Sequence, residues 1–382
     1  MNKYIWAKSI TTISLIFLAT TIVYLYTNGF RIHVTKEQVL DISKTGMVSA
    51  RSIPESANVY LDGILITATN DTIPGIEPGT KTLKILKKGF VPWEKEIEIF
   101  QELVTDITAV LITQSPRIEP LTNTGALFPK ISNSLTKLAY ISKEETTKGI
   151  NILNLSSGFF SGNPTITIKD TNTIKLSEGT DLLWSYNENE LLVKLPQEQW
   201  YLINLTDNSL TTVTNTQKVI QKWEEEFLQK RSDFIDKSKV SDDVKELAKS
   251  NNVLWSPDEK KFLATTEIQN QIIYKVHNLE DPLPVGEKQE TEVIRVPKNQ
   301  NQPKITWYSD SYHLILVDDF NINNDSNGKI SFIRIDGTNK TEIYNNKLFS
   351  DNVFSTPSGD KVIILTSFRS NGQTDIYTVS IR

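Results

Sequence analysis

The chain has 382 residues, of which 38% are apolar and 23% are charged; these are the values of a folded protein and exclude a largely disordered one. Its formal net charge is −5 with no long basic run, which argues against nucleic acid as the main partner. Cysteine is absent, so disulfides, thiolate metal sites and acylation of a cysteine are excluded.

Residues 9–26 form an apolar run without charge, preceded by Lys3 and Lys8. The run is slightly shorter than the roughly 20 residues that cross a bilayer, although Gly29 and Phe30 can extend it. The two lysines place the N-terminus in the cytoplasm by the positive-inside rule. We therefore expect residues 1–8 to be cytoplasmic, residues 9–28 to form a single transmembrane helix, and the bulk of the chain to be extracytoplasmic. A cleaved signal peptide is the alternative, but no A-x-A-like site follows the apolar run.

Residues 29–46 alternate polar and apolar residues with few turn signals, and we expect a tether with one short strand. In residues 47–113, short β-branched runs alternate with glycine-containing breaks, which is typical of a small antiparallel β-sandwich. Its expected strands are 47–53, 58–61, 82–87, 95–100 and 105–112. A segment this short builds a small core, so Phe90 and Trp93 are expected to be buried in it.

Five sequence elements of this segment occur in the order typical of one family. They are Pro54-Glu55-Ser56-Ala57, Val59-Tyr60-Leu61-Asp62-Gly63, Ile76-Glu77-Pro78-Gly79, Lys88-Gly89-Phe90 and Trp93. In these elements the segment resembles a PEGA domain, except that Ser56 stands where the family pattern has glycine. Glycine tolerates a left-handed backbone better, so Ser56 is expected to carry a modest conformational cost. The resemblance implies a non-catalytic sandwich found on exported and surface-layer proteins, where it serves binding or spacing.

Beyond residue 116, five segments repeat an opening, an apolar strand and a third strand. The openings are 128–132, 182–187, 253–258, 305–310 and 353–360; the apolar strands are 138–141, 190–194, 261–265, 313–317 and 361–366; the third strands are 152–155, 201–205, 273–276, 332–335 and 376–379. Such repeats of about 40 to 50 residues are typical of propeller blades. The opening Trp255-Ser256-Pro257-Asp258 resembles the start of a blade in TolB-type periplasmic propellers. We therefore expect a β-propeller of about five blades over residues 117–382, or six if a degenerate blade is present.

The two ends of this propeller are expected to meet in one blade. The last repeat ends at Arg382, with no room for a fourth strand, whereas residues 117–124 resemble the fourth strands 210–215 and 341–345. Residues 117–124 should therefore complete the last blade, which hides edge strands that otherwise pair with other chains.

Residues 216–249 break the repeat and are expected to form a two-helix insertion. Val219, Trp223 and Phe227 have helical spacing, and Ser241 is placed to cap a second helix. Two interpretations of the apolar stripe remain open: it packs on the flank of the propeller, or it docks a partner.

Catalytic motifs are scarce in this sequence. Histidine occurs only as His33, His277 and His313, and G-x-S-x-G, H-E-x-x-H and the glycine-rich nucleotide motifs are absent. Adjacent acids such as Asp242-Asp243 and Asp318-Asp319 are better explained as solvated turn residues than as a glycosidase pair, because sequence neighbours on a strand point to opposite faces.

Three tryptophans recur at one point of the repeat, namely Trp184, Trp255 and Trp307. Stacking on sugars is one interpretation, but recurrence at a repeat position favours packing between blades.

The best metal candidate is a weak calcium loop formed by Asn323, Asp325 and Asn327 with Gly328. Its twelfth position is Arg334 rather than a bidentate glutamate, so a polar hairpin explains the same residues better. We therefore assign no metal site beyond this weak candidate, and we expect no other cofactor and no catalytic residue.

The sequence as a whole predicts a mainly β, membrane-anchored binding or scaffold protein of the cell envelope. Its anchor is residues 9–28, and its propeller presents a surface to an envelope protein or glycan, with no nucleic acid as partner. The alternative is an envelope hydrolase acting on carbohydrate or peptide, with a site at the propeller axis.

Overall fold

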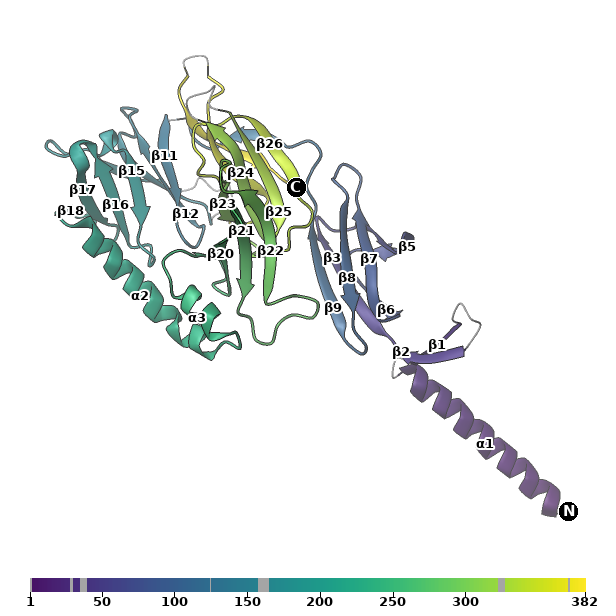
Figure 1. Cartoon of the computed structure of the whole chain (residues 1–382). Coiled ribbons are helices and arrows are strands. Elements are labelled where there is room, and N and C mark those ends of the chain that lie inside the picture. Colours follow the sequence, from purple (N-terminus) through teal and green to yellow (C-terminus); the bar gives the residue numbers. More distant parts are fainter. Residues whose placement is uncertain are drawn as a thin grey trace. The chain divides into compact units, whose positions relative to one another are not determined.

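The computed structural model describes residues 2–27, 30–34, 40–123, 125–156, 165–321, 327–369 and 372–382 (Figure 1). The chain divides into two compact units. The first comprises residues 1–111 with 284–287, and the second comprises residues 112–283 with 288–382.

The first unit begins with helix α1, Asn2–Thr27. Among the described residues, its segment Ile10–Thr27 is the one stretch long and apolar enough to cross a membrane, and none of that stretch is buried. A signal sequence near the N-terminus has the same properties, so both interpretations of the apolar run stand. Strands β1, Phe30–Val34, and β2, Leu40–Lys44, then form an antiparallel pair where a tether with one strand was expected.

Two packed sheets follow, as the sequence predicts. Their strands are β3 Gly46–Ile53, β4 Asn58–Leu61, β5 Ile64–Ala68, β6 Asp71–Ile76, β7 Gly79–Leu86, β8 Trp93–Ile99 and β9 Val104–Val110. One sheet has the order β6-β3-β9 and the other β5-β4-β7-β8. The expectation of a wholly antiparallel sandwich is wrong, because β3 and β9 pair in parallel. These strands begin and end the domain, so their pairing is non-local and leaves no turn signal.

The core of the sandwich contains Trp93, which is 2% exposed and confirms the prediction. Phe90 is only partly buried at the edge of the same cluster, so it contributes less to the core than expected. The buried members are Val48, Ala50, Ala57, Val59, Ile73, Ile76, Leu83, Ile85, Trp93, Ile97, Ile99, Ile107, Ala109 and Leu111. Alternate residues of β3, β7, β8 and β9 supply most of them, as expected for strands with one buried face.

Ser56 has a left-handed backbone, with φ of 59°, and its side chain is exposed. A Cβ atom in this region costs about 1–2 kcal/mol, part of which glycine offsets by greater freedom in the unfolded chain. We expect Ser56→Gly to stabilise the sandwich by about 0.5–1 kcal/mol and Ser56→Ala to change its stability little. Hydrogen exchange of the β3 and β9 amides in the full chain measures this difference. Equal protection in the two variants would show that the conformation carries no cost.

The second unit contains five four-stranded antiparallel sheets among its described residues (Figure 1). The first is β11 Ala126–Ile131, β12 Lys137–Ser142, β13 Gly149–Asn154 and β14 Thr165–Lys169; the second is β15 Asp181–Trp184, β16 Glu190–Leu195, β17 Gln199–Asn204 and β18 Leu210–Val213. The third is β19 Leu254–Trp255, β20 Lys261–Ile268, β21 Gln271–Asn278 and β22 Glu290–Pro297; the fourth is β23 Lys304–Trp307, β24 His313–Asn321, β25 Asn327–Arg334 and β26 Thr341–Lys347. These four sheets keep their strands in chain order, which is the arrangement of propeller blades.

The fifth blade joins the two ends of the propeller. Its strands are β27 Phe354–Ser355, β28 Lys361–Thr366 and β29 Asp375–Ser380, and β10 Ile118–Pro120 completes it by pairing with β29. The predicted closure is therefore confirmed. Side chains reinforce it: the Arg117 amide donates to Ser380 Oγ at 2.8 Å, and Lys361 Nζ lies 2.6 Å from Glu119 Oε2.

Apolar cores are shared between neighbouring blades. One core joins the first and second blades, a second joins the third and fourth, and a third joins the fifth and first. A further cluster packs the third blade against two helices, α2 Thr216–Lys237 and α3 Asp242–Ala248, which connect the second blade to the third. The predicted two-helix insertion is confirmed, and two residues of its apolar stripe, Trp223 and Phe227, contact the second blade. Two short 3₁₀ turns are also present. Leu176–Glu178 connects the first blade to the second, and Pro196–Glu198 lies between β16 and β17.

The two helices are capped differently. Ser241 occupies the N-cap position of α3, as predicted, but its side chain makes no capping hydrogen bond. The N-terminus of α2 is capped instead by Asn215, whose Oδ1 accepts from the amide of Lys218 at 3.0 Å. Asn215 therefore fixes the point at which the chain leaves β18 and becomes helical.

Candidate functional site

The turn between the first two strands has the same construction in every blade. A residue at its start donates its amide to the carbonyl of the residue five positions later, at distances of 2.8 to 3.0 Å. The pairs are Ser132 with Lys137, Ser185 with Glu190, Ser256 with Lys261, Tyr308 with His313 and Thr356 with Lys361. The recurring openings of the sequence are therefore tight turns, and the hydroxyl groups in them serve the backbone rather than a substrate.

Hydroxyl groups and acids complete these turns. Ser256 Oγ accepts from the amide of Lys261 at 3.0 Å and lies 2.5 Å from Asp258 Oδ1. The residue three positions after the turn start has a positive φ in each blade; only the fifth blade uses glycine, Gly359, there. Four blades therefore accept left-handed strain, which the fixed hydrogen bonds of the turn offset.

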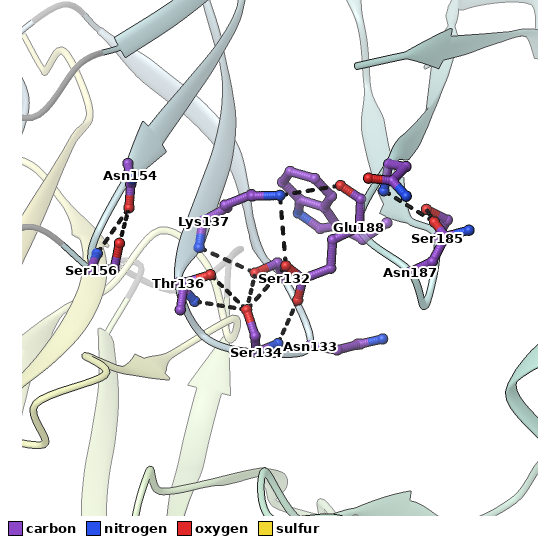
Figure 2. A network of polar contacts seen from close by, with 12 residues as sticks. Ser132, Asn133, Ser134, Thr136, Lys137, Asn154, Ser156, Ser185, Asn187 and Glu188 are labelled. Carbon is purple, nitrogen blue, oxygen red and sulfur yellow. Dashed lines mark hydrogen bonds and ion pairs between the residues drawn. The ribbon is translucent and has the colours of Figure 1, made fainter. Parts of the chain in front are cut away.

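Adjacent turns are connected by side chains. Figure 2 shows the link between the first and second blades, where Glu188 accepts from the Ser134 amide at 2.6 Å and pairs with Lys137 at 3.8 Å. Between the third and fourth blades, the amide of Asp258 donates to Ser311 Oγ at 3.1 Å. Polar contacts between neighbouring turns therefore bridge these two seams of the propeller.

The recurring tryptophans also act between blades. Trp184 Nε1 donates to the carbonyl of Lys130 in the first blade at 3.0 Å, and Trp307 Nε1 donates to the carbonyl of Leu254 in the third blade at 2.8 Å. The interpretation as inter-blade packing therefore holds for these two residues. Trp255 differs, because its ring lies beside Phe262 of its own blade and Arg231 of α2.

The seam between the second and third blades is built by α2. Phe227 of α2 stacks on Tyr186 of the second blade with ring centres 3.9 Å apart, and Arg231 of α2 pairs with Glu259 of the third blade at 2.9 Å. At this seam α2 therefore lies between the two turns, whereas the turns of the first and second blades and those of the third and fourth contact each other directly.

A groove of about 670 Å³ lies on the other side of α2, where the helix faces β18. The last strand of the second blade, β18, forms one wall, and the polar residues Lys218, Gln221 and Lys222 of α2 form the other. The apolar part of its lining is Leu202, Val213, Val219 and Trp223. Trp223 is buried, and its Nε1 donates to Glu190 Oε2 at 2.7 Å, which ties the helix to the second blade. An apolar floor between polar walls is typical of a binding groove.

The two histidines with described side chains are structural. His313 is 1% exposed; its Nδ1 lies 2.7 Å from Asp310 Oδ2 and its ring stacks on Phe332. His277 is 5% exposed and stacks on Phe262, and burial lowers its pKa although Glu290 opposes this. A general base must reach its substrate, and neither ring is accessible to one.

Lys261 carries the most deeply buried charge of the third blade, with a fully buried side chain. Its Nζ lies 3.1 Å from Asp258 Oδ2, 3.0 Å from Glu280 Oε1 and 4.2 Å from the ring centre of Tyr312. Burial acts to lower the pKa of Lys261, but Asp258, Tyr312 and Glu280 outweigh it and hold the pKa above its ordinary value. These contacts satisfy a charge within the blade and leave it no part in binding.

The turn acids of three blades predict acid sensitivity. Burial acts to raise the pKa of Asp258, Asp310 and Asp360. Hydrogen bonds to each carboxyl group, together with the neighbouring Lys261, His313 and Lys361 respectively, outweigh burial and hold each pKa below its ordinary value. A depressed carboxyl pKa adds stability above the unfolded value, and this stability is lost as pH falls through the folded value. We therefore expect urea unfolding of the propeller to need less denaturant below about pH 4 than at pH 7. Asp258→Asn should flatten this dependence, and an unchanged pH profile in that variant would contradict the assignment.

Two residues of the weak calcium candidate, Asn323 and Asp325, lie outside the described residues. Asn327 is exposed and pairs with Asn321 at the start of β25. Arg334 ends the same strand, where it is buried and pairs with Asp336 at 3.2 Å. Seven residues of strand separate Asn327 from Arg334 by about 23 Å, so Arg334 is far from any ion at the loop. Among the described residues, no three His, Cys, Asp or Glu side chains form a group able to hold a metal.

Comparison with known protein families supports the assignment of the N-terminal sandwich. A PEGA domain profile matches residues 45–114. A search of curated proteins returns no match.

Solved structures resemble the chain weakly. TolB from Acinetobacter baumannii matches with 15% identity and a TM-score of 0.26, over 78% of this chain and 59% of TolB, so the chain spans less than two thirds of that protein. The Cps50 (Swd1) β-propeller domain from Myceliophteria thermophila matches with 9% identity and a TM-score of 0.35, over 70% of this chain and 100% of that domain. An auxiliary nutrient binding protein from Bacteroides thetaiotaomicron matches with 8% identity and a TM-score of 0.32, over 85% of this chain and 90% of that one.

The propeller assignment therefore rests on the sheet order and on the closure of β10 onto β29. The sandwich at residues 46–110 coincides with the matched profile. The chain contains a PEGA domain, and its C-terminal part is a β-propeller.

Proposed function

We propose that the protein is a membrane-anchored, extracytoplasmic binding protein of the cell envelope. Its propeller would bind an extended peptide segment of another envelope protein in the groove between β18 and α2. The groove of about 670 Å³ is the observation that carries this proposal.

The walls of the groove favour a peptide as ligand. β18 is the last strand of its sheet, so its outer backbone groups are available to an added strand. Thr211 and Thr212 are exposed along it, and the opposite wall carries both signs of charge through Lys218, Lys222 and Glu225. Backbone hydrogen bonds would provide affinity, and apolar side chains of the peptide would enter the floor near Val219.

The N-terminal part would position this binding site. The apolar segment Ile10–Thr27 serves as the anchor, with residues 1–8 in the cytoplasm, and the PEGA domain serves as a spacer between anchor and propeller. The alternative, an envelope hydrolase, needs accessible acids or histidines that converge on a substrate. The described histidine side chains are buried, and the turn acids Asp258 and Asp310 are occupied by backbone amides and by Lys261 and His313, so we favour binding.

The experiment compares two arginine substitutions on exposed edge-strand residues. Thr211→Arg fills the groove, whereas Asn345→Arg places the same side chain on β26, the edge strand of the fourth blade. Full-length protein of each kind is purified from native membranes, and the envelope proteins that accompany it are quantified. We expect Thr211→Arg to reduce its partner at least tenfold and Asn345→Arg to retain it. Retention by both variants would exclude the groove, and co-sedimentation with envelope polysaccharide that Thr211→Arg abolishes would identify a glycan site instead.

A further inference from the structure

Arg231 of α2 is a buried cation with incomplete hydrogen bonding. Its exposed fraction is 5%, and its Nη2 pairs with Glu259 Oε1 at 2.9 Å. Its Nε and Nη1 have no partner in the described part of the chain. A buried donor without an acceptor costs about 1–3 kcal/mol, and more on a charged group, so two such donors on one guanidinium require an explanation.

Aromatic rings occupy the faces of this guanidinium. Its central carbon lies 3.1 Å from the ring centre of Phe227 and 5.1 Å from that of Trp255. Tyr186 stacks on the far side of Phe227. These rings stabilise a cation through their faces, but they supply no acceptor for N–H groups in the guanidinium plane.

A small cavity lies beside Arg231. Its volume is about 30 Å³, and its walls include Tyr186, Phe227, Asn251 and Trp255. A volume of this size holds one or two water-sized species, so a monatomic ion or a two- or three-atom anion fits and a larger ligand does not.

The charges around the cavity leave Arg231 only partly compensated. Glu259 is shared, because Lys230 pairs with it at 3.2 Å while Arg231 does so at 2.9 Å. Glu224, the acid on the cavity wall, accepts from Asn251 at 2.9 Å. Lys249, the remaining cation on the wall, pairs with Asp236 and Glu246.

We propose that this cavity binds a small monovalent anion, chloride or a short carboxylate such as formate, on the free N–H groups of Arg231. Charge-assisted hydrogen bonds from a guanidinium favour an anion over water. Burial lowers the pKa of Arg231 to about 10 although Glu259 opposes this, which agrees with a cation that lacks part of its counter-charge. A bound anion would hold α2 against both blades, because Tyr186 belongs to the second blade and Trp255 to the third.

Thermal unfolding of the full-length protein tests this site. Chloride, bromide or formate replaces gluconate, which is too large for the cavity, at constant ionic strength and pH. A ligand that binds the folded state raises the Tm by about 3 °C for each tenfold rise in concentration above its Kd. We expect chloride and bromide to raise the Tm of the unsubstituted protein above its value in gluconate. If formate raises the Tm as well, the site accepts both halides and short carboxylates. If formate alone raises it, the ligand is a carboxylate.

Matched variants assign the effect to Arg231. Arg231→Lys keeps the charge but loses the planar donors, and it should abolish the anion dependence of the Tm. Lys230→Met removes the neighbouring exposed partner of Glu259 and should retain that dependence. Equal Tm values of the unsubstituted protein in all four salts, or the same anion dependence in Arg231→Lys, would overturn the proposal.

Crystals of the protein grown in bromide give a readout independent of stability. Anomalous scattering should place one bromide beside Arg231. Density there without an anomalous signal, together with no rise of the Tm in formate, would identify water and overturn the anion site.

Discussion

Replacing Lys261 by alanine is expected to destabilise the propeller by about 3 kcal/mol. Its ammonium group is fully buried between Asp258 and Glu280, and its removal leaves two carboxylates facing each other without a cation. Removal of one partner of a buried pair typically costs about 3–5 kcal/mol, and the value here is at the lower end because Asp258 is 31% exposed. Urea unfolding of the full-length protein, followed by circular dichroism, measures the loss.

Lys361 is the matched control, because it occupies the same repeat position in the fifth blade. Its partner Glu119 is 54% exposed, so solvent screens the pair. Lys361→Ala should cost less than about 1 kcal/mol. Equal losses in the two variants would show that burial does not decide the contribution of this position.

Trp307→Ala is expected to cost about 4 kcal/mol. The side chain is 5% exposed within the core shared by the third and fourth blades, and its Nε1 donates to the carbonyl of Leu254 across the seam. Truncation of a buried tryptophan removes its packing and leaves a cavity, for which about 3–5 kcal/mol is typical. The same urea unfolding experiment quantifies the effect.

Two further variants test the role of Trp307 between the blades. Trp307→Phe retains most of the apolar volume but leaves the Leu254 carbonyl without its donor, so we expect a loss of about 1–2 kcal/mol. Trp255→Ala should cost less than Trp307→Ala, because Trp255 is only partly buried and faces the helical insertion. A larger loss for Trp255→Ala would contradict the inter-blade role assigned to Trp307.

The propeller could be predicted from the sequence because its repeat is local. Ser256 and Thr356 recur at the same point because the hydroxyl of each accepts from the backbone of its own turn. Trp184 and Trp307 recur because each reaches the preceding blade. Closure by residues 117–124 followed from their resemblance to fourth strands of other blades.

Parts of the sandwich could not be predicted. Pro74 and Gly75 lie inside β6, and an irregular register near Ile66 interrupts β5, so neither segment shows simple alternation. The parallel pairing of β3 with β9 joins residues more than 50 positions apart, and nothing in either strand encodes its partner.

The candidate site was predicted only in part. The helical spacing of Trp223 and Phe227 indicated an apolar stripe, and both residues do pack on the propeller. The groove depends on how α2 leaves β18, which the Asn215 cap and the Trp223–Glu190 hydrogen bond determine, and neither is visible as a motif. Arg231 lies among polar residues in sequence, so its burial is a consequence of tertiary packing alone.

The central claim is that the groove between β18 and α2 binds an extended peptide, and photo-crosslinking tests it most directly. A photoreactive residue replaces exposed Thr212 in the groove wall or, as control, exposed Asn345 on β26 of the full-length protein in its native membrane. Mass spectrometry then identifies the crosslinked residues. We predict that Thr212 yields crosslinks to one short segment of one envelope protein and that Asn345 does not. The same crosslinks from both positions, or none from Thr212, would contradict the claim.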